Sequence, residues 1–179
     1  MKAGSNTTDL DTPREVIFDK ETGSLLIQLV KETFDLEGNT VYLEGIPLEP
    51  KDELHITILS RDAADTLSQH LEKNPEDEDR VRRLIDETRW EYRKLDRFYH
   101  VREEPGVETI IQMVEIPGLA SFFNQLSQIV KVELGRPPTH VTLYMRGTQK
   151  GIGLPTQAEF ERLAQKQIHP AVLESERKN

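Results

Sequence analysis

The chain has 179 residues and a net charge of −9, with 36% hydrophobic and 31% charged residues, which is typical of a globular domain with a charged surface. The acidic balance disfavours long double-stranded nucleic acid as a partner, and the lack of cysteine excludes disulfides, thiolate catalysis and cysteine-ligated zinc. Without a membrane-length apolar run or an apolar signal core near Met1, a cytoplasmic location without membrane contact is expected.

The first part of the chain is expected to be strand-rich. Residues 1–13 are small and polar and predict a mobile leader. Apolar runs at 16–18 and 25–27 flank a turn-forming segment and predict a hairpin, with a helix over 25–34 as the alternative. Strands are expected at 41–43 and over about 53–59, with a loop bracketed by Pro47 and Pro50.

Two helices should follow. The first begins near Ser60, which can cap it, and ends at Asn74–Pro75. The second covers about 76–94, and its apolar stripe consists of Val81, Leu84, Ile85, Thr88 and Tyr92. Four acidic residues, 76–79, fall in its first turn, where the helix dipole favours negative charge; metal binding is the alternative explanation.

The remainder alternates between strands and helices. Strands over 95–103 and 107–116 can form a hairpin through Pro105–Gly106, and an amphipathic helix should run from Leu119 to about Leu134. A strand over 139–146 precedes a Gly-rich loop, 147–155, and a capping box at Thr156 opens a helix that ends at His169–Pro170. This order predicts an α+β or α/β fold with a largely antiparallel sheet. A single domain is expected over 14–170, followed by a polar tail, 171–179, that should be loose from Glu174.

One short pattern occurs twice. His55-Ile56-Thr57 and His140-Val141-Thr142 both read His-x-Thr within β-type runs. Successive strand side chains point to opposite faces, so each copy presents an imidazole and a hydroxyl together over an apolar face that can pack on a core. A strand histidine taken alone is usually structural. The matched context of the two copies favours a shared catalytic or phosphate-binding site.

Further candidates surround the second copy. Tyr144 and Arg146 share the expected face of His140 and Thr142, and Lys150 lies in the segment 147–153, whose glycines would let backbone N–H groups approach an anion. An ordinary strand aromatic and a plain flexible loop are the alternatives, and the segment is not a Walker loop.

Several residues outside the two motifs are further candidates for the lining of a groove. On the strand 95–103, either the face with Phe98, His100 and Arg102 or the face with Arg97 and Tyr99 could line it. His70 and His169 are interpreted as structural, and Trp90 lies off the main stripe of its helix. A zinc site made of both motif histidines and a carboxylate is the chemical rival, although no His-x-x-x-His or His-Glu-x-x-His spacing supports it.

The doubled motif resembles the signature of the two-histidine (2H) phosphoesterase superfamily, which includes RNA 2′,3′-cyclic phosphodiesterases, often called 2′,5′-RNA ligase-like proteins. The resemblance covers the two motifs and the order of elements from about 41 to 146; residues 14–40 and the C-terminal helix match nothing in it. It implies two lobes of mostly antiparallel sheet with helices outside and a central groove. It also implies that His55 and His140 are the acid–base pair, that Thr57 and Thr142 bind phosphate, and that no metal or other cofactor is needed.

The chemistry of the residues is consistent with that expectation. Histidine titrates near neutrality and can serve as base or acid, and a threonine hydroxyl can donate a hydrogen bond to a phosphate oxygen. The first hypothesis is therefore a hydrolase that opens a 2′,3′-cyclic phosphate of an RNA end or a small nucleotide. The alternatives are a non-catalytic module that binds a nucleotide or RNA end in the same groove, and a ligase-like transferase. Residue types alone do not assign acid and base.

Overall fold

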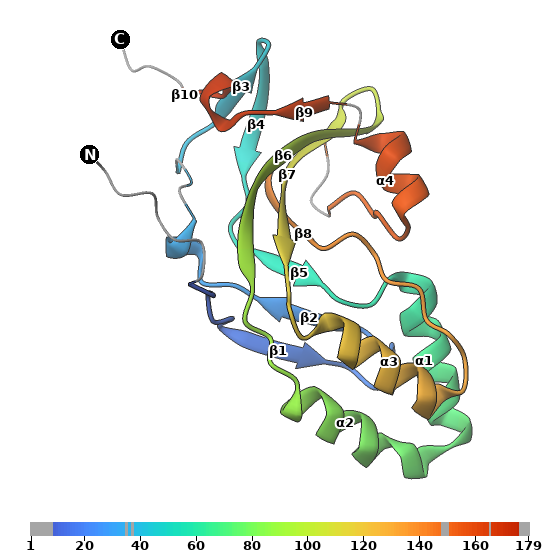
Figure 1. Cartoon of the computed structure of the whole chain (residues 1–179). Coiled ribbons are helices and arrows are strands. Elements are labelled where there is room, and N and C mark those ends of the chain that lie inside the picture. The colour runs from blue at the N-terminus through green and yellow to red at the C-terminus, as the bar shows by residue number, and fades with distance from the viewer. Residues whose placement is uncertain (1–8, 35, 37, 148–150, 165, 176–179) are drawn as a thin grey trace.

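The computed structural model describes residues 9–34, 36, 38–147, 151–164 and 166–175 (Figure 1). Within these ranges, antiparallel strands form two curled sheets that are accompanied by four α-helices, in agreement with the predicted α+β class. None of the helices in these ranges has the length and apolar character needed to cross a membrane.

The smaller sheet has the order β1-β2-β5, with β1 at Glu15–Phe18, β2 at Leu25–Gln28 and β5 at His55–Thr57. The predicted hairpin of β1 and β2 is confirmed, and the alternative helix over 25–34 is reduced to a 3-10 turn at Lys31–Thr33. Gly23 closes the hairpin at a φ of 72°, and a Cβ there would collide with the backbone carbonyl of Ala64. The hairpin tip therefore packs directly on a helix.

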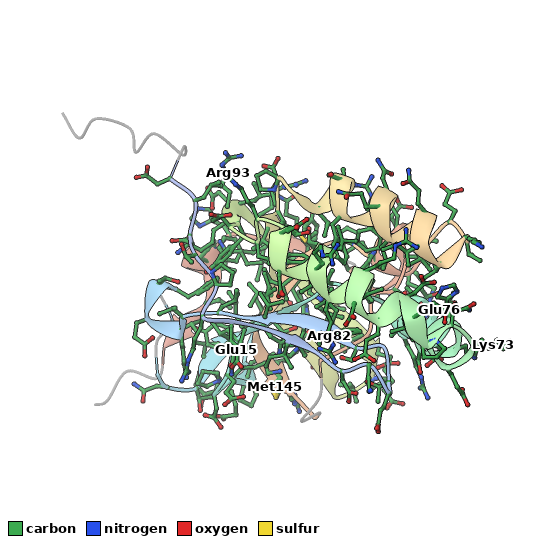
Figure 2. The ribbon with its side chains drawn as sticks, turned by 90° about the horizontal axis from the view of Figure 1, so that it is seen from below. Glu15, Lys73, Glu76, Arg82, Arg93 and Met145 are labelled. Carbon is green, nitrogen blue, oxygen red and sulfur yellow. The ribbon has the colours of Figure 1, made fainter. Side chains whose placement is uncertain are left out.

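Three helices lie beside this sheet (Figure 1): α1 at Arg61–Lys73, α2 at Glu78–Glu87 and α3 at Leu119–Val130. Ser60 caps α1 as expected, accepting a hydrogen bond from the Ala63 N–H at 3.3 Å. In the view of Figure 2, α2 lies between α3 and β1. The guanidinium of Arg82 of α2 lies over the ring of Phe18 of β1, 5.3 Å from its centroid. α3 ends at Val130, four residues before the expected Leu134, because Lys131 adopts a left-handed conformation.

The prediction that the second helix runs to about residue 94 is wrong. It ends at Glu87, and Thr88, the residue after it, is extended with a ψ of 136°. The Leu84 carbonyl still accepts its helical bond from the Thr88 N–H at 3.1 Å, and Thr88 Oγ1 donates to the same carbonyl at 2.6 Å. Trp90 Nε1 donates to the Ile85 carbonyl at 3.0 Å, which satisfies a carbonyl that a longer helix would have used. Trp90 also packs edge-to-face on Phe122, which accounts for a residue that the helical stripe left unexplained.

The larger sheet has the order β10-β3-β4-β8-β7-β6-β9. The long strands β6 and β7 form a hairpin at the centre of this sheet and curve across the molecule (Figure 1). This confirms the hairpin predicted around Pro105–Gly106. The strands are β3 at Val41–Leu43, β4 at Ile46–Pro50, β6 at Arg93–Glu104, β7 at Val107–Glu115, β8 at His140–Arg146, β9 at Lys166–Ile168 and β10 at Glu174–Ser175.

The loop expected between Pro47 and Pro50 is instead strand β4. A two-residue turn at Glu44 and Gly45, both with positive φ, returns the chain onto β3. β4 meets β8 only through Glu49 and Pro50, so the part of that edge that contains Pro47 is open and tolerates a residue without a backbone N–H. The Glu–Gly dipeptide was the missed turn signal.

The C-terminal region also differs from expectation. The helix that begins after Thr156, α4, covers only Gln157–Leu163, and the chain then forms β9 against β6. The tail predicted to be loose from Glu174 pairs at its first two residues with β3. At the other end, Asp11 forms a two-hydrogen-bond bridge with Tyr92, so the fold begins before residue 14. Residues 1–8 lie outside the described residues.

Two apolar clusters hold these elements together. The large one fills the space between the three helices and both sheets and includes Ile27, Ile56, Phe122 and Leu126. The small one joins α4 and the segment before it to the larger sheet, through Ile152, Leu154, Phe160 and Leu163, among others. The candidate site lies where the second cluster meets β5 and β8.

Candidate active site

The two His-x-Thr motifs line one cavity of about 490 Å³. His55 and Thr57 come from β5 in the smaller sheet, whereas His140 and Thr142 come from β8 in the larger sheet. β5 and β8 approach each other without being paired in one sheet (Figure 1). The structure therefore brings all four residues singled out by the motif to a single surface.

Strand alternation explains how the side chains reach the cavity. The middle residues of the motifs, Ile56 and Val141, are fully buried at 0% exposure, so the flanking histidines and threonines must point the opposite way. β5 is held in register by β2, with His55 opposite Gln28, and β8 by β7, with His140 opposite Met113. The apolar core thus fixes the direction of both polar pairs.

The His140 ring has a defined orientation. Its Nδ1 lies 2.9 Å from the carbonyl oxygen of Pro138, which can only accept a hydrogen bond, so Nδ1 carries the proton. In the neutral ring the lone pair is then on Nε2. Burial lowers the pKa of His140 below its usual value, the bond to Pro138 opposes this, and the charge of His55 lowers the pKa further. The unliganded site therefore favours neutral His140.

The pKa of His55 depends on burial and on two neighbouring charges. Burial is the main cause that lowers its pKa, the ammonium of Lys51 lowers it further, and Glu53 opposes both. The Lys51 backbone N–H donates to the Leu143 carbonyl at 2.9 Å, which ties this lysine to β8 as well as to the approach of β5. Burial also lowers the pKa of Lys51 itself. Its ammonium makes no ion pair with any residue of the described ranges.

A Gly-rich segment forms another wall. Residues 151–155 all line the cavity, and Ile152 and Leu154 are at the same time buried in the small apolar cluster, which anchors the segment. A Cβ at Gly151 would lie 3.4 Å from Thr142 Oγ1, so the backbone approaches the threonine hydroxyl closely. The expected glycine-lined loop does border the site, through its second half.

Three predicted contacts fare differently. Tyr144 does not share the face of His140, because a bulge at Leu143 sets Thr142 opposite Ile111 but Tyr144 opposite Ile110. Its side chain is buried in the large core and borders a different cavity. Arg146 lies beside Glu108, 3.7 Å between Nη1 and the carboxylate, and is absent from the lining of the motif cavity. Lys150 lies outside the described residues.

The side chains on the two faces of β6 have different surroundings. On one face, His100 Nε2 and Arg102 Nη2 both bind the Glu108 carboxylate at 2.8 Å, away from the motif cavity. On the other face, Arg97 and Tyr99 line a groove that shares Pro137 and Pro138 with that cavity.

The remaining polar residues have structural partners. His70 Nε2 binds Asp77 at 2.7 Å, and His169 accepts from the Ala171 N–H at 3.1 Å. In the acidic cluster, Glu78 pairs with Lys20 and Arg82. Across the described part of the chain, no three histidine and carboxylate side chains gather closely enough to hold a metal ion.

Two cations of the cavity were not anticipated from the sequence. Lys51 lies in the non-strand segment between β4 and β5, where strand alternation gives no signal for the direction of its side chain. Arg61 lines the cavity from the first turn of α1, and its exposed guanidinium has no partner among the described residues. Both are placed to meet an anion.

Comparisons with protein-family models, with curated protein sequences and with solved structures find no match for this chain. Conclusions about its function therefore depend on the site itself.

Proposed function

We propose that the protein is a two-lobed 2H-type phosphodiesterase that opens a 2′,3′-cyclic phosphate on an RNA end or a small nucleotide without a metal or other cofactor. The observation that carries this proposal is the convergence of both His-x-Thr pairs, from strands of two different sheets, on one cavity. Each sheet supplies one histidine and one threonine, which agrees with the arrangement expected of two lobes facing a groove.

The resting proton positions suggest roles for the two histidines. Neutral His140, with its proton held by Pro138 and a lone pair on Nε2, is the base that takes a proton from the attacking water. The water oxygen forms a bond to phosphorus, and the bond from phosphorus to one ribose oxygen breaks. Protonated His55 gives its proton to that leaving oxygen. Both histidines regain their starting states by exchanging protons with solvent.

The electrostatics of the two histidines limit how many protons the pair can carry. The charge of His55 lowers the pKa of His140, so double protonation is disfavoured. A bound phosphate anion raises the pKa of both rings, so that one of them can take up and hold the proton that acid catalysis needs. The pair should therefore keep its single proton to a higher pH in the substrate complex than in the free protein.

The neighbouring donors are suited to a phosphate. The hydroxyls of Thr57 and Thr142 can donate to the non-bridging oxygens, where charge builds as water attacks. Lys51 adds a positive charge that no acidic side chain of the described residues neutralises by an ion pair. Fixed donors and a partly buried cation are worth more in such a cavity than in water.

Hydrolysis of nucleoside 2′,3′-cyclic phosphates and of a short RNA with a cyclic end tests the proposal. It is measured with a chelator present, for the natural protein, His55→Ala and His140→Ala. His169→Ala is the matched control, because His169 is exposed and lies outside the cavity. We expect turnover that survives chelation, is retained in the control and falls by at least about 100-fold in each motif variant.

Other outcomes point elsewhere. Turnover abolished by the chelator alone would contradict the metal-free mechanism. Nucleotide binding without turnover, retained after loss of either histidine, would favour the non-catalytic binding module.

A further inference from the structure

The groove beside the motif cavity contains an unneutralised pair of arginines. Arg97 and Arg136 both line this groove, whose volume is about 390 Å³, and both are exposed. Neither has an ion pair or side-chain hydrogen bond within the described ranges, although the chain has an excess of acidic residues. Two like charges on one groove repel each other unless an anion lies between them.

The position of the two arginines relates them to His140. Arg136 precedes Pro137 and Pro138, which border both the groove and the motif cavity. Arg97 belongs to an irregular stretch of β6 between Lys94 and Phe98, opposite Met113 of β7, and Met113 is paired on its other side with His140. The irregular stretch that contains Arg97 therefore lies two strands away from His140 in the same sheet.

The charges around the motif cavity also give this direction. Its wall toward α4 and the end of β6 carries Glu103, whose carboxylate would repel a second phosphate, and Glu159, which is paired with Arg162 at 2.7 Å. The arginine groove offers the opposite charge across the shared prolines. A second phosphate is therefore placed more favourably on the side of Arg97 and Arg136 than beside Glu103.

We propose that Arg97 and Arg136 bind a second phosphate group of the substrate, attached to the nucleoside whose cyclic phosphate lies between His55 and His140. This inference rests on the proposed function and narrows its substrate class from any nucleoside cyclic phosphate to one that bears another phosphate. That group is either the internal phosphodiester of an oligonucleotide or a terminal 5′-phosphate. Arginine suits both, because its planar guanidinium donates two parallel hydrogen bonds to phosphate oxygens.

Three substrates separate these sources: a nucleoside 2′,3′-cyclic phosphate, its 5′-phosphorylated form, and a dinucleotide with a 2′,3′-cyclic end. For the natural protein we expect kcat/KM to be about tenfold higher when the second phosphate is present, as for one charge-assisted contact. Arg97→Ala and Arg136→Ala should each reduce this preference and the double variant should abolish it. Turnover of the nucleoside 2′,3′-cyclic phosphate without a second phosphate should stay unchanged. Arg83→Ala, an exposed arginine of α2 outside the groove, is the control.

Salt provides a second readout. Each lost phosphate contact should lower the dependence of log(kcat/KM) on log salt concentration by about 0.7 for the phosphate-bearing substrates. The substrate with the larger preference, dinucleotide or 5′-phosphate, identifies the source of the second phosphate. An unaltered preference in the double variant would overturn the inference.

Failure of the proposed function gives a different pattern. If the natural protein hydrolyses none of the three, binding of a 3′-phosphorylated dinucleotide and of a 3′-phosphorylated nucleoside is titrated instead. Weaker binding of the dinucleotide alone in the arginine variants still supports the second phosphate site. Equal effects on both ligands, or no binding of either, would overturn it.

Discussion

His55 and His140 interact electrostatically across the cavity that they share, although they belong to different sheets. A charge on His55 lowers the pKa of His140, and burial lowers the pKa of both rings below the usual 6.5. The free protein should therefore carry a single proton on the pair only on the acidic side of that value. This coupling makes the pH profile a direct test of the site.

We expect kcat/KM for a 2′,3′-cyclic nucleotide to be bell-shaped, with its optimum below pH 6.5. Activity rises as the base loses its proton and falls as the acid loses its proton, and both pKa values of the free protein are lowered. The profile of kcat should lie at higher pH, because bound phosphate raises both values. Steady-state rates from pH 4 to 9 give both profiles. A kcat/KM optimum well above pH 7 would contradict this arrangement.

Replacing Lys51 should change both the pH profile and the affinity. The Lys51 ammonium lowers the pKa of His55, so Lys51→Met raises that pKa and moves the alkaline limb of kcat/KM to higher pH if His55 is the acid. A shift of the acidic limb instead would reverse the assignment of acid and base. Loss of the cation should also weaken phosphate binding about tenfold, measured as KM or as the inhibition constant of a nucleoside monophosphate.

Substitutions of the two threonines and of Tyr144 test which of the predicted side chains contact the substrate. Thr57→Val and Thr142→Val remove a hydroxyl at nearly constant volume and should each lower kcat by about 10- to 100-fold, since the lost hydrogen bond forms to the charged transition state. Tyr144→Phe should leave kcat/KM unchanged, because Tyr144 borders another cavity. A large loss of activity in Tyr144→Phe, with unaltered thermal stability, would place the tyrosine in the site after all.

The sequence predicted which side chains of each motif share a strand face, because strand alternation is a local rule. Alternation about Ile56 and Val141 placed each histidine on the same face as its threonine, and the hairpin of β1 and β2 followed from its turn residues. The meeting of the two motifs in one cavity is a tertiary relationship that neither strand predicts by itself. The errors came from tertiary contacts that leave no local signal. The bulge at Leu143 contains no glycine and reversed the face of Tyr144. The Ile85 carbonyl is bonded by the indole of Trp90 instead of by the N–H of a further helical turn.

Gly23→Ala should destabilise the fold. Gly23 has a φ of 72°, and a Cβ there would meet the Ala64 carbonyl, so the hairpin would have to move away from α1. We expect the free energy of unfolding to fall by about 2 kcal/mol or more, from left-handed strain and lost packing together. Urea denaturation followed by circular dichroism measures the change. Gly45→Ala, at a similar φ but with no atom within 4 Å of the new Cβ, is the control and should show the strain alone.

The buried carboxylate of Glu108 gives a prediction independent of catalysis. Its side chain is 2% exposed and is surrounded by His100, Arg102 and Arg146. Burial alone would raise its pKa, but the hydrogen bonds from Arg102 and His100 outweigh this and hold the pKa below the usual 4.5. Glu108 therefore stabilises the fold above that pH, and the stabilisation is lost as the pH falls through its lowered pKa.

Glu108→Gln removes the charge while keeping the shape of the side chain. At neutral pH the free energy of unfolding should fall by about 2 kcal/mol, since the cationic groups lose their counter-charge. The difference from the natural protein should shrink as the pH is lowered below 4.5, where the natural carboxyl also becomes protonated. Urea denaturation at several pH values measures this, with Glu87→Gln, an exposed carboxylate of α2, as the control. A difference that does not vary with pH would mean that Glu108 acts through packing rather than charge.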